Sequence, residues 1–258
     1  VVGDFGLLDN LVRHHMTQLS RRQVAHSLCQ LSIAMAANLS LAPPARAKSS
    51  SSVQVGSASI ALPIPAGYSD PTARAPKLKS LLESSTIAQK KFLAGFVSTD
   101  DVEAEASGRD PNLRLYFVAQ TLRAAELMTT SSAAFENTKK IIRDQFQTLA
   151  PLTGPALSEL VERLTSAAGQ TVAHTKVAPV GIFDETPASI SVTAINTSVV
   201  SSGAATITDS TIVSATTALV RGKYIYLQVC SDLAAAKDVL ENQDASRAWT
   251  RAILVANQ

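Results

Sequence analysis

The stretch TTALVRGKYIYLQVC, residues 216–230, is typical of a β-hairpin that turns at Arg221 and Gly222. Its second arm alternates aliphatic and tyrosine side chains, which point to opposite faces of a strand: Ile225, Leu227 and Val229 on one face, Tyr224 and Tyr226 on the other. Because neither face is polar, we expect this hairpin to belong to a sheet that is covered on both sides.

Extended apolar runs elsewhere in the chain predict further strands. They occupy residues 90–98, 113–122 and 189–200, and a shorter run precedes Pro63. Residues 99–112, between two of these runs, are acidic and are expected to form a loop. A turn is expected between Phe183 and Pro187.

Apolar residues at helical spacing predict the helices. These begin near Pro76, at Ser131 or Ser132, near Pro155, and near Asp232 at the end of the chain. Amphipathic helices must bury their apolar stripes, and the sheet is the available surface. We therefore expect one α+β domain over residues 57–258, an α-β-α sandwich whose central, mostly antiparallel sheet is covered by helices on both faces.

Residues 16–47 carry the features of an export signal. Arg21 and Arg22 precede a weakly apolar run that ends in Ala-Pro-Pro-Ala-Arg-Ala. Polar residues interrupt the run, so we expect no stable membrane span; the alternative to a signal is an amphipathic surface helix. The arginine pair resembles a twin-arginine signal, and the ordinary Sec route stays open. We expect cleavage after Ala47 and a periplasmic or secreted location.

The same interpretation divides the rest of the N-terminal region. Residues 1–15 precede the natural start at Met16 and are expected to be an upstream or non-native segment. Residues 48–56 contain the polar run KSSSS and are expected to form a disordered linker.

Charge and cysteine content limit the classes of function. Four of the 23 basic and two of the 21 acidic residues precede Lys48, so the remaining chain is electrically balanced. A balanced chain gives no reason to expect binding to a nucleic acid or an anionic membrane, which requires clustered basic residues. After cleavage Cys230 and His174 are the remaining cysteine and histidine. No intramolecular disulfide can then form.

Three segments carry a family resemblance: ALPIPAGY (61–68), LVRGKYIYLQV (219–229) and RAWTRAILVAN (247–257). They resemble segments of a group of uncharacterised exported bacterial proteins, and the order of elements is similar to that of the PsbP-like α-β-α sandwich. The resemblance implies an accessory or binding role without catalysis. Metal sites in some such proteins use histidine and acidic ligands, and this chain offers no second histidine beside His174 after cleavage.

Catalytic signatures are missing from the sequence. It has no Gly-x-Ser-x-Gly, no phosphate-binding glycine loop, no His-Glu-x-x-His and no Cys-x-x-Cys. His174 is the candidate base of a serine-type hydrolase, which is one alternative function. The more ordinary interpretation of His174 is a structural or surface histidine.

Acidic residues give a second alternative, a calcium-dependent binding protein. Its candidate ligands crowd one short segment: Asp100, Asp101, Glu103 and Glu105. Their spacing is not that of a helix-loop-helix calcium site, and a solvated acidic loop is the competing interpretation. Asp184 and Glu185 are adjacent, so on an extended chain they point apart and do not form a catalytic pair.

The hairpin supplies the candidate residues for binding a ligand or partner. Arg221 and Lys223 flank its turn, and Tyr224 and Tyr226 follow. Solubilising charges and core aromatics are the competing interpretations. We expect a non-enzymatic accessory or binding protein, with no cofactor or metal, whose partner is an envelope protein or a small ligand.

Overall fold

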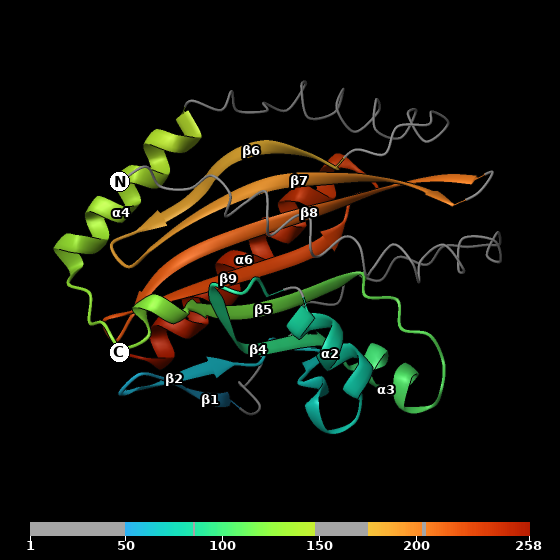
Figure 1. Ribbon diagram of the computed structural model, residues 1–258, viewed down its shortest axis with the longest axis horizontal. Helices are drawn as coiled ribbons and strands as arrows, with labels where there is room; N and C mark the ends of the chain where they lie inside the picture. The colour runs from blue at the N-terminus through green and yellow to red at the C-terminus, as the bar shows by residue number, and fades with distance from the viewer. Residues whose placement is uncertain (1–49, 85, 148–174, 203–204) are drawn as a thin grey trace, which may run out of the picture.

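The computed structural model describes residues 50–84, 86–147, 175–202 and 205–258, which are coloured in Figure 1. Within these residues seven strands form one sheet in the order β3-β4-β5-β9-β8-β7-β6, and every neighbouring pair is antiparallel. Strands β1 and β2 form a separate hairpin. The strands are β1 (Ser50–Val55), β2 (Ala58–Pro63), β3 (Tyr68–Ser69), β4 (Lys90–Ser98), β5 (Leu115–Leu122), β6 (Thr175–Thr186), β7 (Ser189–Ser202), β8 (Ala205–Val220) and β9 (Lys223–Asp232). The expected α+β class with an antiparallel sheet is confirmed.

Four α-helices lie among the described residues: α2 (Pro76–Ser84), α3 (Thr99–Ala106), α4 (Ser132–Gln147) and α6 (Ala236–Ala256). Short 3-10 turns lie at η1 (Pro71–Ala73) and η2 (Arg123–Ala125). Ser131 caps α4, because its hydroxyl accepts a hydrogen bond from the Ala134 amide at 3.2 Å. No helix in this part of the chain is long and apolar enough to cross a membrane.

Helix α6 closes the main hydrophobic core. Trp249 and Ile253 of α6 are buried with aromatic and aliphatic residues of the sheet and of the β1–β2 hairpin, among them Phe96, Phe117, Ile225, Leu227, Val229, Ile60 and Leu62. The Trp249 ring meets Phe117 edge to face, with centroids 5.2 Å apart. Its indole nitrogen donates to the Pro63 carbonyl at 3.0 Å, so the β1–β2 hairpin is fixed to α6. Figure 1 shows α6 behind the sheet.

A second core contains the residues that alternate with those of the first. Leu78 and Leu82 of α2 and Val102 of α3 are buried together with strand residues Val97, Tyr116, Val118, Val213 and Cys230. The tyrosine-bearing side of β9 therefore belongs to this second side of the sheet. Successive residues of β9 therefore face the two cores in turn, as the alternating sequence of the hairpin predicts.

Hydroxyl groups replace apolar contacts where α6 crosses β7 and β8. Thr216 is buried within 3.3 Å of the Ser246 hydroxyl and 3.4 Å of the Thr250 hydroxyl, both on α6. The Gln243 amide donates to Thr193 at 3.2 Å. Buried polar groups are stable when each finds a partner, and these groups supply one another.

Several expected boundaries differ from the structure. Most of the expected disordered linker, 48–56, is strand β1: Val53 and Val55 alternate with polar residues, and residues 50–55 pair in register with β2. The expected acidic loop begins with helix α3, because the Ser98 hydroxyl accepts a hydrogen bond from the Asp101 amide and caps it. The expected turn after Phe183 comes later, since β6 continues to Thr186.

The final helix begins at Ala236 and not near Asp232, because β9 extends through that residue. The expected helix near Pro155 and the expected export signal, 16–47, lie outside the described residues.

Candidate functional site

The tip of the β8–β9 hairpin holds a neighbouring loop in place. Lys223, the first residue of β9, is 2% exposed, and its ammonium donates to the Glu126 carbonyl at 3.1 Å and to the Met128 carbonyl at 2.7 Å. A buried ammonium requires hydrogen-bond partners, and these two carbonyls supply them. They flank Leu127, so Lys223 fixes the backbone on both sides of that residue.

Two glycines make room for the same segment, residues 126–130, called here the 126–130 loop. Gly222 has φ +75° and its carbonyl accepts a hydrogen bond from the Thr130 amide at 2.8 Å. Gly56, in the turn between β1 and β2, has φ +58°, and a Cβ there would lie 2.3 Å from the Glu126 carbonyl oxygen. Gly56 therefore requires glycine for conformation and for space, and Gly222 favours glycine for conformation.

An ion pair holds the start of the 126–130 loop. The Lys91 ammonium of β4 donates to the Glu126 carboxylate. This hydrogen bond holds the pKa of the Glu126 carboxyl below its usual value. The loop is thus tied to β4, to β9 and to the β1–β2 turn.

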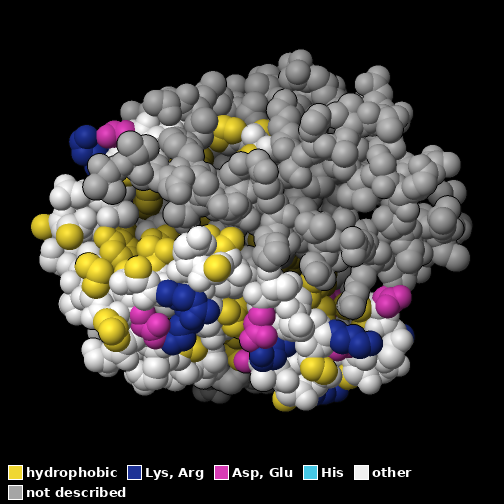
Figure 2. Space-filling model, in the orientation of Figure 1, with side chains coloured by type: hydrophobic (Ala, Val, Ile, Leu, Met, Phe, Trp, Pro, Cys, Tyr) yellow, Lys and Arg dark blue, Asp and Glu magenta, His cyan; other side chains and the backbone are white. Residues whose placement is uncertain are grey.

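The loop that these contacts fix carries two adjacent, exposed apolar side chains. Leu127 is 86% exposed and Met128 is 62% exposed. Apolar side chains cluster on the front of the molecule on the side where α4 lies (Figures 1 and 2). A segment with fixed backbone that presents adjacent large apolar side chains to solvent has the character of a docking surface.

Tyr224 connects the hairpin to helix α4. Its hydroxyl lies 2.7 Å from the Thr138 hydroxyl, and its ring centroid lies 5.9 Å from that of Phe135. The Thr121 hydroxyl donates to the Tyr224 carbonyl at 2.8 Å. Tyr224 therefore positions α4, which begins directly after the 126–130 loop.

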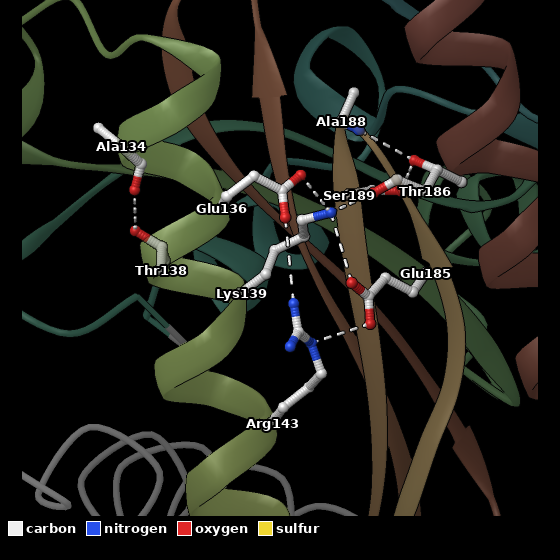
Figure 3. A network of polar contacts seen from close by, with 9 residues as sticks. All are labelled: Ala134, Glu136, Thr138, Lys139, Arg143, Glu185, Thr186, Ala188 and Ser189. Carbon is white, nitrogen blue, oxygen red and sulfur yellow. Dashed lines mark hydrogen bonds and ion pairs between the residues drawn. The ribbon is translucent and has the colours of Figure 1, made fainter.

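A charged network also fixes α4, as Figure 3 shows. The Lys139 ammonium, on a side chain 4% exposed, lies 2.8 Å from Glu136 and 3.4 Å from Glu185 of β6, and it donates to the Thr186 carbonyl at 2.8 Å. Arg143 Nε lies 3.3 Å from the second Glu185 oxygen, at ion-pair distance but without hydrogen-bond geometry. The network pins α4 to the end of β6.

The four residues expected to bind a ligand or partner each contact a different part of the protein. Arg221 has φ +50° and donates to the Ser59 carbonyl at 3.1 Å, which joins the tip to β2. Lys223 holds the 126–130 loop, and Tyr224 contacts α4. The ring of Tyr226 lies beneath the Lys90 ammonium, whose nitrogen is 4.6 Å from the ring centroid. Burial raises the pKa of Tyr226 to about 12. Of the four, Lys223 contacts the segment whose exposed part is Leu127 and Met128.

The acidic candidates are used as backbone caps. One Asp101 oxygen accepts from the Asn112 and Leu113 amides at 2.6 and 3.2 Å, and the other accepts from the Ser98 hydroxyl. Glu105 accepts from the first amides of α2, at Lys77 and Leu78, both at 2.8 Å.

The other two acidic candidates, Asp100 and Glu103, are exposed. Within the described ranges no group of three or more His, Cys, Asp or Glu side chains is arranged to hold a metal ion.

The other candidates for catalytic chemistry are His174, Cys230 and the adjacent pair Asp184 and Glu185. His174 lies outside the described residues. Cys230 is buried, and its burial raises the pKa of the thiol to about 12, so the reactive thiolate is disfavoured. Asp184 and Glu185 lie in β6, and the Glu185 carboxylate faces Lys139 and Arg143.

Comparison with known proteins does not add a function. No family model matches the chain, and no curated protein and no solved structure matches it.

Proposed function

We propose that this chain is an exported, non-enzymatic binding protein that docks an envelope partner protein through Leu127 and Met128. The observation that carries the proposal is the pair of hydrogen bonds from Lys223 to the carbonyls on either side of Leu127. Interfaces concentrate their binding energy in a few apolar and aromatic anchors, and an anchor held in one conformation loses less entropy on binding.

Exposure of the pair favours a partner protein over a structural role. Single exposed apolar residues are common on protein surfaces and require no explanation. Leu240 and Val255, both on α6, are such residues, 62% and 61% exposed. Leu127 and Met128 differ from them because a buried ammonium, two glycines and an ion pair hold their segment.

The proposed architecture is the PsbP-like α-β-α sandwich. Its support is the alternation of the two cores along β5 and β9, with α6 in one and α2 and α3 in the other. Fold analogy alone is a weak argument for function, so the binding role rests on the 126–130 loop.

The proposed location is the periplasm or the exterior, reached by Sec or twin-arginine export. Ser50, the first residue of β1, lies three positions after Ala47, so cleavage there leaves the described strand intact. The intact mass of the protein recovered from the envelope fraction tests this step. We expect the mass of residues 48–258, whereas the uncleaved mass would contradict export by this signal.

The partner is tested by native size. The Leu127→Ser/Met128→Ser variant and a matched Leu240→Ser/Val255→Ser control are each extracted from the envelope of the host under mild conditions. We expect the wild type and the control to elute in a complex and the loop variant to elute as the free chain. Equal elution of both variants would contradict docking through the loop.

A further inference from the structure

A buried lysine without a counter-charge among the described residues lies on the tyrosine-bearing side of the sheet. Lys90, at the start of β4, is 3% exposed, and its ammonium stands 4.6 Å above the centroid of the Tyr226 ring. In the described part of the chain no carboxylate forms an ion pair with it. Burial lowers the pKa of Lys90 to about 8, in agreement with an ammonium that lacks a compensating anion.

Two buried carboxamides share this side of the sheet. Gln120 is 0% exposed and Gln228 is 3% exposed, and the side-chain oxygen of each has no hydrogen-bond partner. Gln120 pairs with Tyr226 across β5 and β9, and Gln228 lies two residues further along the same face of β9. Such neighbours lie about 5 to 8 Å apart, within reach of one small molecule.

Rotation of the Gln120 amide does not remove this deficit. Its nitrogen donates to the Thr86 hydroxyl at 3.0 Å, and a hydroxyl can also donate, so rotation would pair the oxygen and leave the amide nitrogen without this partner. An unsatisfied buried acceptor costs about 1–3 kcal/mol, which makes two of them on one face a feature that calls for a physical reason. A ligand with a hydroxyl for the Gln120 carboxamide and an anion for Lys90 would satisfy both of these groups.

We propose that Lys90, Gln120 and Gln228 form a binding site for a small hydroxycarboxylic acid. The carboxylate faces the Lys90 ammonium, and the single hydroxyl pairs with the unpaired carboxamide group of Gln120. A carboxylate matches this site better than a phosphate because the described residues offer it one cation, whereas a doubly charged group is typically recognised by arginines and backbone amides. The inference is independent of docking through the 126–130 loop.

The test uses matched acids that differ by the hydroxyl. Titration calorimetry at pH 7 on the full chain compares glycolate with acetate, lactate with propionate, and 3-hydroxybutyrate with butyrate. We expect at least one hydroxy acid to bind at least tenfold more tightly than its partner, because a site built around a hydroxyl rejects the analogue that lacks it.

Variants separate binding from a structural role. We expect Gln120→Leu to reduce the preference for the hydroxy acid to less than threefold and Lys90→Met to abolish binding of every acid. Lys91→Met is the control: it removes the adjacent lysine, which is paired with Glu126, and should leave acid binding unchanged.

Other outcomes would overturn the proposal. These are the absence of binding by all six acids, equal binding within each pair, binding of inorganic phosphate alone, or unchanged binding in Lys90→Met. The Leu127→Ser/Met128→Ser variant should bind the acids as the wild type does. Loss of partner docking with retained acid binding, or the reverse, therefore shows which of the two proposals has failed.

Discussion

The side chain of Asn257 forms two hydrogen bonds with the backbone of Ala61, and these replace the bonds that a neighbouring strand would make there. The Asn257 amide donates to the Ala61 carbonyl at 2.8 Å, and the Asn257 oxygen accepts from the Ala61 amide at 2.9 Å. The same amide also donates to the Ile253 carbonyl at 2.8 Å, which fixes the rotamer. One residue after α6 thereby joins that helix to strand β2.

Replacement of Asn257 should loosen the β1–β2 hairpin. Asn257→Ala leaves the Ala61 amide and carbonyl unpaired, and we expect the free energy of unfolding to fall by about 1–3 kcal/mol. Asn257→Asp keeps the acceptor but places a carboxylate oxygen against the Ala61 and Ile253 carbonyls, so its effect at neutral pH should be larger. Urea denaturation measures both, and a loss below about 0.3 kcal/mol in the alanine variant would contradict the assignment.

Two glycines in turns should respond differently to the same change. Gly56 and Gly67 have φ +58° and +82°, so alanine is strained at both. A Cβ at Gly67 meets nothing within 4 Å, whereas at Gly56 it meets the Glu126 carbonyl oxygen at 2.3 Å. We expect Gly67→Ala to cost about 1–2 kcal/mol and Gly56→Ala clearly more, by thermal unfolding. Equal losses of stability in the two variants would mean that the 126–130 loop moves to accommodate the new methyl group at little cost.

Lys223 should control the mobility of the 126–130 loop. Lys223→Met leaves the Glu126 and Met128 carbonyls without their donor, and we expect a stability loss of about 2–4 kcal/mol. Hydrogen exchange over residues 126–130 should accelerate more than exchange in β4 or β9. Leu127→Ser is the control, since it removes no tie and should leave exchange of the loop unchanged. Unchanged loop exchange in Lys223→Met would contradict the role of the lysine.

Lys90 should leave a signature in the pH dependence of stability. Burial lowers its pKa from 10.5 to about 8. Below pH 8 the lysine is charged in both states, and the folded state carries the burial penalty. Between pH 8 and 10.5 the unfolded chain binds the additional proton, so this contribution to stability rises with pH. The difference corresponds to about 3 kcal/mol.

The comparison of wild type with Lys90→Met isolates this effect. Lys90→Met lacks the burial penalty that the charged lysine imposes. The free energy of unfolding of the variant minus that of the wild type should therefore be about 3 kcal/mol larger at pH 7 than at pH 10.5. Titration of the Tyr226 hydroxyl and the Cys230 thiol, whose pKa values burial raises to about 12, lowers stability at high pH in both chains. A difference that is constant over this pH range would show that Lys90 keeps its ordinary pKa.

The sequence predicts the sheet well because the signals of strands are local. The alternation in residues 216–230 predicts both the turn at Gly222 and the side of the sheet that each residue faces. The serine-rich start of β1 lacks such a signal, and that strand exists because β2 pairs with it. Asp101 and Glu105 suggest a solvated loop by composition, yet they hold backbone amides.

The candidate site is harder to predict because the residue that fixes the 126–130 loop is distant from it in the sequence. Leu127 and Met128 lie in a segment without periodicity, and the Lys223 ammonium that fixes them belongs to a residue 95 positions after Met128. The prediction did select Lys223 and Tyr224. It expected them to touch a partner, whereas in the structure their polar groups contact the protein itself.

Photo-crosslinking in the native host tests the central claim most directly. A photoreactive phenylalanine analogue is placed at Leu127 in one chain and at Leu240, a leucine of α6 that is 62% exposed, in another. We predict one discrete crosslinked protein from Leu127 and none from Leu240 after irradiation of the envelope fraction. The same products from both positions, or none from Leu127, would contradict docking through the 126–130 loop.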